Sequence, residues 1–210
     1  MNRPSLLLFD LGGVLIESYV FERLNGYLSE PLERTAIKAR WLLSPSVRRF
    51  ESGETEPFEF AENFISEWGL RLTPQVFLNE FKSWPRAFFP GARELLRELR
   101  TVYRVGCLSN SNPLHWEKFK DFEEDFDIVL ISHLLGAVKP DREIFMLALH
   151  QCEVEPCEVY FFDDCYDNVR TAQSLGITAF HVDGFKALLD VLRIQGLLSE
   201  AESSAREIQF

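Results

Sequence analysis

Polar side chains follow three apolar stretches of this sequence, and their types could do chemistry together. The stretches are Leu6–Phe9, Val102–Leu108 and Val159–Phe162, and they end at Asp10, Ser109 and the pair Asp163 and Asp164. An aspartate such as Asp10 could, by itself, equally cap the segment that follows. Because the carboxyl ends of parallel strands lie at the same edge of a sheet, however, we expect these side chains to lie close together.

Carboxylates that lie this close need a cation beside them, because like charges oppose one another's ionisation. The set offers oxygen atoms without Cys or His, which is typical of a hard cation such as Mg²⁺. Lys139, in a loop before a predicted helix, adds a fixed positive charge. Ser109 and the backbone amides after it can donate to phosphate oxygens. These residues predict a phosphoryl-transfer site in which Asp10 attacks phosphorus and forms an aspartyl-phosphate.

The elements that must position these residues alternate between strand and helix. The opening run Leu6–Ile16 is apolar almost throughout, which is typical of a strand buried on both faces, and Gly12 and Gly13 allow a sharp turn after it. Further strands are predicted at 102–108, 128–131, 159–162 and 177–182, and helices at 92–100, 141–151 (with Pro140 at its first position), 168–175 and 187–194. Strands separated by such helices predict an α/β fold with a Rossmann-like parallel sheet.

The segment from Glu17 to Phe89 has a different composition, rich in Glu, Arg, Phe and Leu, with no credible β-branched strand. Helices are predicted over 20–28 and 32–43 and after Pro57 and Pro74. We therefore predict a core of residues 1–16 and 90–198, a helical insertion of residues 17–89, and a polar tail of residues 199–210. The many phenylalanines of the insertion are expected to form its own core.

Composition limits the partners of the chain. Its 210 residues carry a net charge of −11, which argues against nucleic acid or an anionic membrane surface as the main partner. The four cysteines form no CxxC pair, and the first apolar run is too short to span a bilayer. These features predict a cytoplasmic protein with a small phosphorylated substrate, and leave monomer or dimer open.

Four short motifs, in their order along the chain, resemble the haloacid dehalogenase-like hydrolase superfamily. The motifs are Phe9–Leu15, Leu108–Asn110, Val138–Asp141 and Phe161–Asp164, and the helical insertion resembles the helical cap of that superfamily. Residues Phe50–Glu54 and Ser109–Asn112 are most similar to its sugar-phosphatase branch, which includes glucose-1-phosphate phosphatases and is similar to the phosphatase half of soluble epoxide hydrolase.

The resemblance implies a role for each matching residue. Asp10 would be the nucleophile and a metal ligand, and the Gly12 carbonyl and Asp164 would also bind Mg²⁺. Ser109 and Asn110 would hold the phosphate, and Lys139 would pair with the phosphate and Asp10. Asp163 and Asn168 would support the metal loop.

One position departs from the family pattern. Most phosphatases of the superfamily carry an acid–base aspartate two residues after the nucleophile, where this chain has Gly12. An active phosphatase would then prefer substrates with good leaving groups, such as anomeric or aryl phosphates. A catalytically silent protein that binds a phosphometabolite or a protein partner is the main alternative. A mutase or a dehalogenase is the third, although a dehalogenase needs no metal.

Other residues have simpler explanations. The four histidines show no ligand spacing, although His115 and Trp116 follow the second motif and could reach a substrate. Cys165, next to Asp164, is expected to pack rather than react. Arg48, Arg49 and Glu51 could contact a sugar, but charges on a helix surface commonly face solvent, which is the default expectation for these three.

Overall fold

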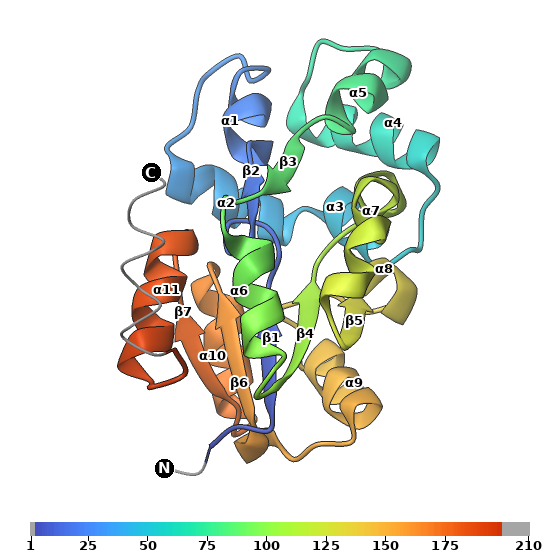
Figure 1. The fold of residues 1–210 in the computed structure, drawn as a ribbon. Helices are drawn as coiled ribbons and strands as arrows, with labels where there is room; N and C mark the ends of the chain where they lie inside the picture. Colours follow the sequence, from blue (N-terminus) through green and yellow to red (C-terminus); the bar gives the residue numbers. More distant parts are fainter. Residues whose placement is uncertain (1–2, 199–210) are drawn as a thin grey trace.

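A five-stranded parallel sheet forms the centre of the computed structural model, which describes residues 3–198 (Figure 1). Its strands are β1 (Leu6–Phe9), β4 (Arg104–Ser109), β5 (Ile128–Ile131), β6 (Val159–Asp163) and β7 (Thr178–His181). They lie in the order β5-β4-β1-β6-β7, so the first strand of the chain takes the central position. The predicted α/β fold with a parallel sheet is confirmed.

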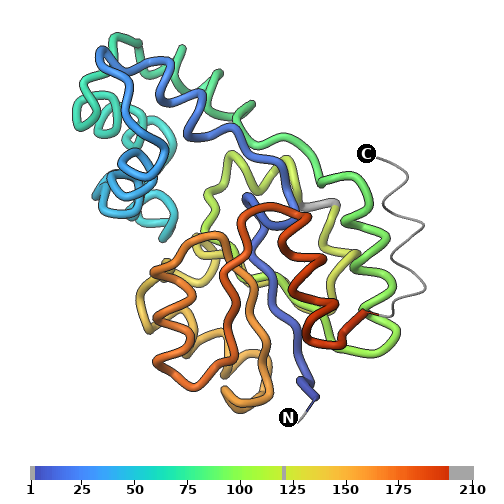
Figure 2. The backbone as a smooth tube through the Cα atoms, turned by 90° about the vertical axis from the view of Figure 1, so that its left-hand side faces the viewer, coloured from blue at the N-terminus to red at the C-terminus, as the bar shows by residue number. Residues whose placement is uncertain are grey.

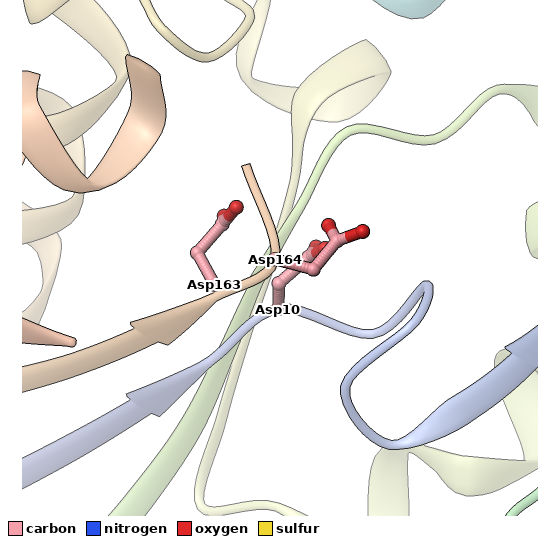
Figure 3. A group of neighbouring side chains, drawn as sticks. All are labelled: Asp10, Asp163 and Asp164. Carbon is pink, nitrogen blue, oxygen red and sulfur yellow. The ribbon is translucent and has the colours of Figure 1, made fainter. Parts of the chain in front are cut away.

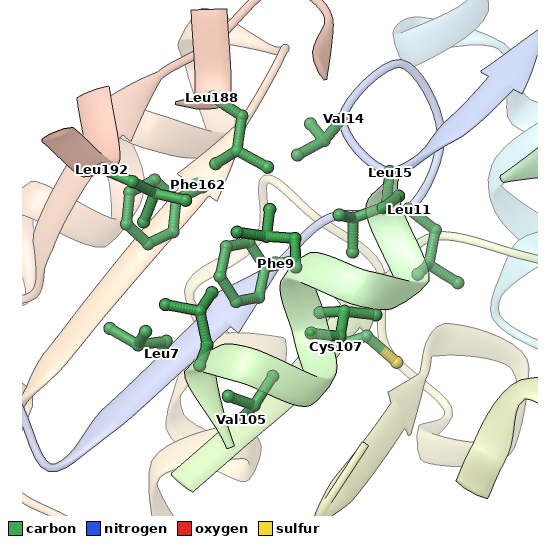
Figure 4. Close-up of a cluster of buried hydrophobic side chains, with 14 of the residues drawn as sticks. Leu7, Phe9, Leu11, Val14, Leu15, Val105, Cys107, Phe162, Leu188 and Leu192 are labelled. Carbon is green, nitrogen blue, oxygen red and sulfur yellow. The ribbon is translucent and has the colours of Figure 1, made fainter. Parts of the chain in front are cut away.

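Helices cover both faces of this sheet. They are α6 (Ala92–Leu99), α9 (Arg142–Cys152), α10 (Tyr166–Ser174) and α11 (Phe185–Ile194). Helices α6 and α11 pack on the face to which Leu7 and Phe9 point (Figure 4), and α9 and α10 pack on the face of Leu6 and Leu8. Because successive side chains of a strand point to opposite faces, a strand covered on both sides needs an apolar residue at every position. This explains the unbroken apolar run before Asp10.

Two short strands connect the sheet to the helices inserted after it. Strands β2 (Ile16–Ser18) and β3 (Pro85–Phe88) pair antiparallel, and Figure 2 shows the two connecting segments side by side. The prediction that the insertion is helical is therefore incomplete, because β3 lies within it. Strand β3 contains no β-branched residue, which is why β-propensity does not reveal it.

Five helices between these strands form a separate layer, which we call the cap. They are α1 (Val20–Asn25), α2 (Arg34–Leu43), α3 (Pro45–Glu51), α4 (Pro57–Trp68) and α5 (Pro74–Phe81). Phe60, Phe64, Phe77 and Phe81 are fully buried within one cluster of the cap, as the sequence predicts. No bounds were predicted for helix α3, although Ser44 caps its first turn by accepting from the Val47 amide.

The remaining elements are short and lie around the core. They are α7 (Pro113–Phe119), the 3₁₀ turns η1 (Lys120–Asp125) and η2 (Pro156–Glu158), and α8 (Ser132–Leu135). Pro140 does not open α9: it lies in a turn after a cis Lys139–Pro140 bond, and the helix begins at Arg142. Among the residues that the structure describes, no helix is both long and apolar enough to cross a membrane. The predicted tail, 199–210, lies outside the described residues.

His115 ties α7 to the cap. Its Nε2 donates to the Phe81 carbonyl at 2.9 Å, its Nδ1 accepts from the Asn112 amide at 3.1 Å, and its ring stacks on Phe81. Burial lowers the pKa of His115 to about 4, against the opposing effect of the Phe81 carbonyl. His115 and Trp116 both line the cavity described below. The hydrogen bonds use both ring nitrogens of His115, so its role in the structure is to join cap and core.

We expect His115 to make the stability of the protein depend on pH. Its folded-state pKa lies below the unfolded value of about 6.5, so the unfolded chain binds more protons and stability falls as pH falls below 6.5. Between pH 7 and pH 5 the loss is about 2 kcal/mol. His115→Phe keeps the stacking on Phe81 but removes this contribution. The measurement is urea unfolding of both proteins at the two pH values.

The exposed His150 provides the control, because His150→Phe makes the same chemical change on the surface of α9. That variant should follow the pH dependence of the parent. Parallel stability curves for His115→Phe and the parent would contradict the prediction.

Candidate active site

Lys139 lies at the centre of the candidate site and binds two carboxylates. Its Nζ donates to Asp10 Oδ1 at 2.9 Å, to Asp163 Oδ2 at 2.6 Å and to the Leu108 carbonyl at 2.7 Å. A lysine ammonium has three protons to donate, so all of them are used. Burial acts to lower the pKa of Lys139, but the two carboxylates outweigh it and raise the pKa above its ordinary value. Lys139 is therefore a fixed positive charge.

Asp163, the last residue of β6, is fully buried and held from both sides. The Asn168 side-chain amide, in the first turn of α10, donates to both of its carboxylate oxygens at 2.9 and 3.0 Å. The backbone N–H of Cys165 donates to Asp163 Oδ1 at 2.7 Å. Asp163 therefore fixes the position of Lys139, and Asn168 fixes that of Asp163.

Asp164 adds a third carboxylate to Asp10 and Asp163 (Figure 3). One oxygen from each of the three lies within 4.8 Å of the others. Gly13, with a φ of +76°, lies three residues after Asp10, and a Cβ there would lie 2.9 Å from Asp164 Oδ2. Only glycine adopts that backbone conformation readily and leaves the space for Asp164.

Burial and mutual repulsion shift the pKa values of the carboxyl groups in this cluster. Burial raises the pKa of Asp10 to about 7, Lys139 acts in the opposite direction, and Asp163 and Asp164 raise it further by repulsion. Burial likewise raises the pKa of Asp163. A cation beside the cluster would relieve this repulsion.

The donor set of this cluster fits a hard divalent cation. It consists of the carboxylate oxygens of Asp10, Asp163 and Asp164, without a Cys or His side chain. Asp10 and Asp164 are the two carboxylates of the cluster that are not wholly enclosed, whereas Asp163 is 0% exposed. Asp10 and Asp164 are therefore better placed than Asp163 to bind an ion directly.

Ser109 and Asn110 follow β4 and line the same cavity as Asp10 and Lys139. Asn110 exchanges two hydrogen bonds with the backbone of Lys139, accepting from its N–H at 2.8 Å and donating to its carbonyl at 3.0 Å. These bonds hold the second and third motifs together. Ser109 Oγ makes only a long bond of 3.4 Å, to the Asn110 carbonyl, which leaves it able to turn to a ligand.

The cap contributes two side chains to the site, of which Lys38 was not singled out in the sequence and Glu51 was a possible sugar contact with a default expectation of facing solvent. Lys38 Nζ on α2 donates to Asp164 Oδ2 at 2.7 Å. Glu51, expected on a solvent-facing helix surface, is instead 8% exposed and lines the cavity. Of its neighbours, Arg49 does face solvent, with about half of its side chain exposed, and Arg48 pairs with Asp141 of the core. No local pattern marks Lys38, because only the docking of the cap brings it to the sheet, whereas Glu51 lies in the Phe50–Glu54 motif that resembles the sugar-phosphatase branch.

The cavity between cap and core has a volume of about 560 Å³. It reaches from Asp10 and Lys139 to the aromatic side chains Phe21 and Trp41, and it also contains Arg34, Lys38 and Arg48 from the cap. A volume of this size is typical of small-molecule sites. Of these cap cations, Lys38 pairs with Asp164 and Arg48 with Asp141, both in the core.

Comparison with known families identifies the chain. Residues 4–176 match the haloacid dehalogenase-like hydrolases. The matched residues include the cap, the sheet strands β1, β4, β5 and β6, and all three residues of the carboxylate cluster. The chain belongs to this family, and the resemblance seen in its motifs is confirmed.

Individual relatives agree with this assignment. A crystal structure of an enzyme of this family from Bacteroides thetaiotaomicron, in complex with magnesium and inorganic phosphate, is 26% identical, covers 85% of this chain and 94% of its own, and has a TM-score of 0.68. A D-ribitol-5-phosphate phosphatase from the same organism is 26% identical over 83% of this chain and 89% of its own length. The rat bifunctional epoxide hydrolase 2 is 24% identical over 90% of this chain. The chain spans only 38% of the length of that hydrolase, and 18% of the mouse acyl-CoA dehydrogenase family member 10.

Proposed function

We propose that this chain hydrolyses phosphate monoesters of small metabolites in a Mg²⁺-dependent reaction with Asp10 as the nucleophile. The observation that carries the proposal is the cluster of Asp10, Asp163 and Asp164 at the carboxyl edge of the sheet, with Lys139 bound to the first two of them. A phosphatase among the relatives and a magnesium and phosphate complex among the similar structures support it.

In this proposal each residue acts through its chemistry. Asp10 attacks phosphorus and displaces the leaving oxygen, and the aspartyl-phosphate is then hydrolysed by water. Lys139 neutralises charge on the transferring phosphoryl group and holds the Asp10 carboxylate in place. Ser109 and the amides after it donate to phosphoryl oxygens. Asp10, Asp164 and the Gly12 carbonyl would hold Mg²⁺, which supplies positive charge at the phosphoryl oxygens.

The cavity supports a substrate that combines a phosphate with a compact organic group. Arg34, Thr35 and Arg48 line it and can bind hydroxyl groups or further charge, and Phe21 and Trp41 offer apolar surfaces. A sugar phosphate suits this combination, and a relative acts on ribitol 5-phosphate. A panel of phosphorylated metabolites at fixed Mg²⁺ would identify the substrate class.

Removing the metal tests the proposal directly. We expect excess chelator to lower the hydrolysis of an aryl phosphate to the level of Asp10→Asn, and added Mg²⁺ to restore it, because the phosphoryl charge is otherwise opposed by three carboxylates. The measurement is phosphate release before and after chelation. Phosphate release that continues in excess chelator would contradict the metal assignment.

The second candidate function is a silent binding protein, and Gly12 is the observation that favours it. A phosphorylated metabolite would then bind in the same cavity without turnover. Equal and negligible hydrolysis by the parent and by Asp10→Asn, together with binding of the metabolite by calorimetry, would favour this alternative.

A further inference from the structure

The site contains no acid–base side chain at Gly12. Gly12 lines the cavity, and apart from its chain neighbours Leu11 and Gly13 no residue has an atom within 4 Å of where a Cβ of Gly12 would be. A proton donor for the leaving oxygen must therefore come from elsewhere. Among the described residues, the carboxylates that line the cavity are Asp10, Glu51, Asp164, Asp167 and Asp183.

Only one of these carboxylates is buried and lies outside the cluster of Asp10, Asp163 and Asp164. Asp10 and Asp164 belong to the cluster, and Asp167 and Asp183 are exposed. Glu51 is 8% exposed, and the structure gives it no ion pair in the part of the chain that it describes. A carboxyl group in this setting can stay protonated near neutral pH, as proton donation requires.

The groups around Glu51 shift its pKa in opposite directions. Burial raises its pKa to about 7, while Lys139, a hydrogen bond from Trp41 and the Arg48 charge act in the opposite direction, and Asp10 adds repulsion. On the helices packed against α3, Lys38 of α2 binds Asp164 and Glu67 of α4 binds Ser46. On α8, burial lowers the pKa of His133.

Contacts on both sides of Glu51 hold it toward the core. One turn earlier on α3, Arg48 pairs with Asp141, which lies two residues after Lys139. Two residues later, Gly53 adopts a φ of +79° against α8, where an added Cβ would lie 2.6 Å from the His133 carbonyl oxygen. Glu51 is therefore placed by a contact between cap and core rather than by a flexible loop.

We propose that Glu51 is the acid–base catalyst of this site, supplied by the cap in place of the side chain that Gly12 lacks. The assignment rests on the proposed phosphatase function. In the first step Asp10 forms a bond to phosphorus, the bond from phosphorus to the ester oxygen breaks, and that oxygen takes the proton of Glu51. In the second step Glu51 takes a proton from water, the water oxygen bonds to phosphorus, and the bond to Asp10 breaks. Phosphate leaves, and both carboxyl groups return to their first state.

The experiment compares substrates whose leaving groups differ in their need for a proton. Glu51→Gln keeps the size of the side chain and removes the titrating proton. On an alkyl phosphate we expect its activity to fall by about 10²–10⁴-fold. On an aryl phosphate we expect a rapid burst of phenolate, with one equivalent per enzyme, followed by slow turnover. The phosphorylated Asp10 that accumulates should be detectable by mass spectrometry of the acid-quenched protein.

Two further variants complete the design. Glu51→Asp retains an acid at a shorter reach and should recover part of the alkyl phosphate activity. Glu62→Gln makes the same change as Glu51→Gln at an exposed position on α4 and should match the parent. Thermal unfolding of each variant shows that it is folded.

The outcomes separate this proposal from the proposed function. If the parent is active and Glu51→Gln loses activity equally on both substrates without a burst, Glu51 has only a positioning role and the proposal is overturned. It is also overturned if Glu51→Gln matches the parent on both substrates. If the parent itself does no better than Asp10→Asn, the phosphatase function fails, and the assignment of Glu51 falls with it.

Discussion

Asp10→Asn is expected to lower kcat by roughly 10⁴–10⁶-fold, the range seen when covalent enzymes lose their nucleophile or its activating group. An amide is a poor nucleophile at phosphorus, so no phosphorylated enzyme should form. Asparagine keeps the size of Asp10 and an oxygen for Lys139, whose Nζ lies 2.9 Å from Asp10 Oδ1. The measurements are steady-state hydrolysis of an aryl phosphate and the mass of the acid-quenched protein.

Stability provides the control for this variant. Burial raises the pKa of Asp10 to about 7, so the folded protein is destabilised by ionisation of this carboxyl group. Asp10→Asn should therefore unfold at a temperature no lower than the parent, which excludes loss of fold as the cause of inactivity. Asp190→Asn, on α11 and outside the cavity, should change neither activity nor Tm by much. Undiminished hydrolysis by Asp10→Asn would remove Asp10 from the reaction.

Lys139→Met should affect both activity and stability. Lys139 is 1% exposed and is the only cation that the described structure pairs with Asp10 or Asp163. Without it two carboxylates remain buried without a countercharge, which typically costs about 3–5 kcal/mol. We expect Tm to fall by about 10 °C, and kcat by about 10²–10³-fold because the phosphoryl charge loses a preorganised partner. Differential scanning calorimetry and steady-state kinetics measure the two effects.

A double-mutant cycle shows whether charge is the cause. Adding Asp163→Asn to Lys139→Met removes one of the two uncompensated charges, so the double variant should be more stable than the sum of the single losses implies. Lys82→Met, at an exposed position after α5, is the matched control and should retain the parental Tm. Additive losses in the cycle would mean that packing, rather than charge, accounts for the effect of Lys139.

The residues at the sheet edge could be predicted because their signals are local. Continuous apolar residues before Asp10 and Asp163 indicate strands buried on both faces, and topology then brings their ends together. The core helices could be predicted for a similar reason, since their apolar spacing and the flanking Gly and Pro residues lie within one segment. Each of these patterns depends only on residues that are close in the sequence and on whether the element packs against the sheet.

The contribution of the cap could not be predicted in the same way. Lys38 and Asp164 are 126 positions apart, and their ion pair exists only because α2 docks above the sheet. The motif around Glu51 resembles a branch of the family, but the burial of its side chain depends on α3 resting against α8. Strand β3 is defined by its partner β2 rather than by its own residues. These features depend on tertiary packing, which overrides local preference.

The pairing of β2 with β3 has a consequence for how this fold can vary. Ser18 lies opposite Pro85, so the chain returns close to the point at which it leaves the core. For a segment closed at its ends in this way, each doubling of its length costs only about 0.6 kcal/mol of chain entropy. In terms of chain closure, a change in the length of the segment between residues 19 and 84 therefore costs little. Such a change leaves β1, which ends just before Asp10, undisturbed.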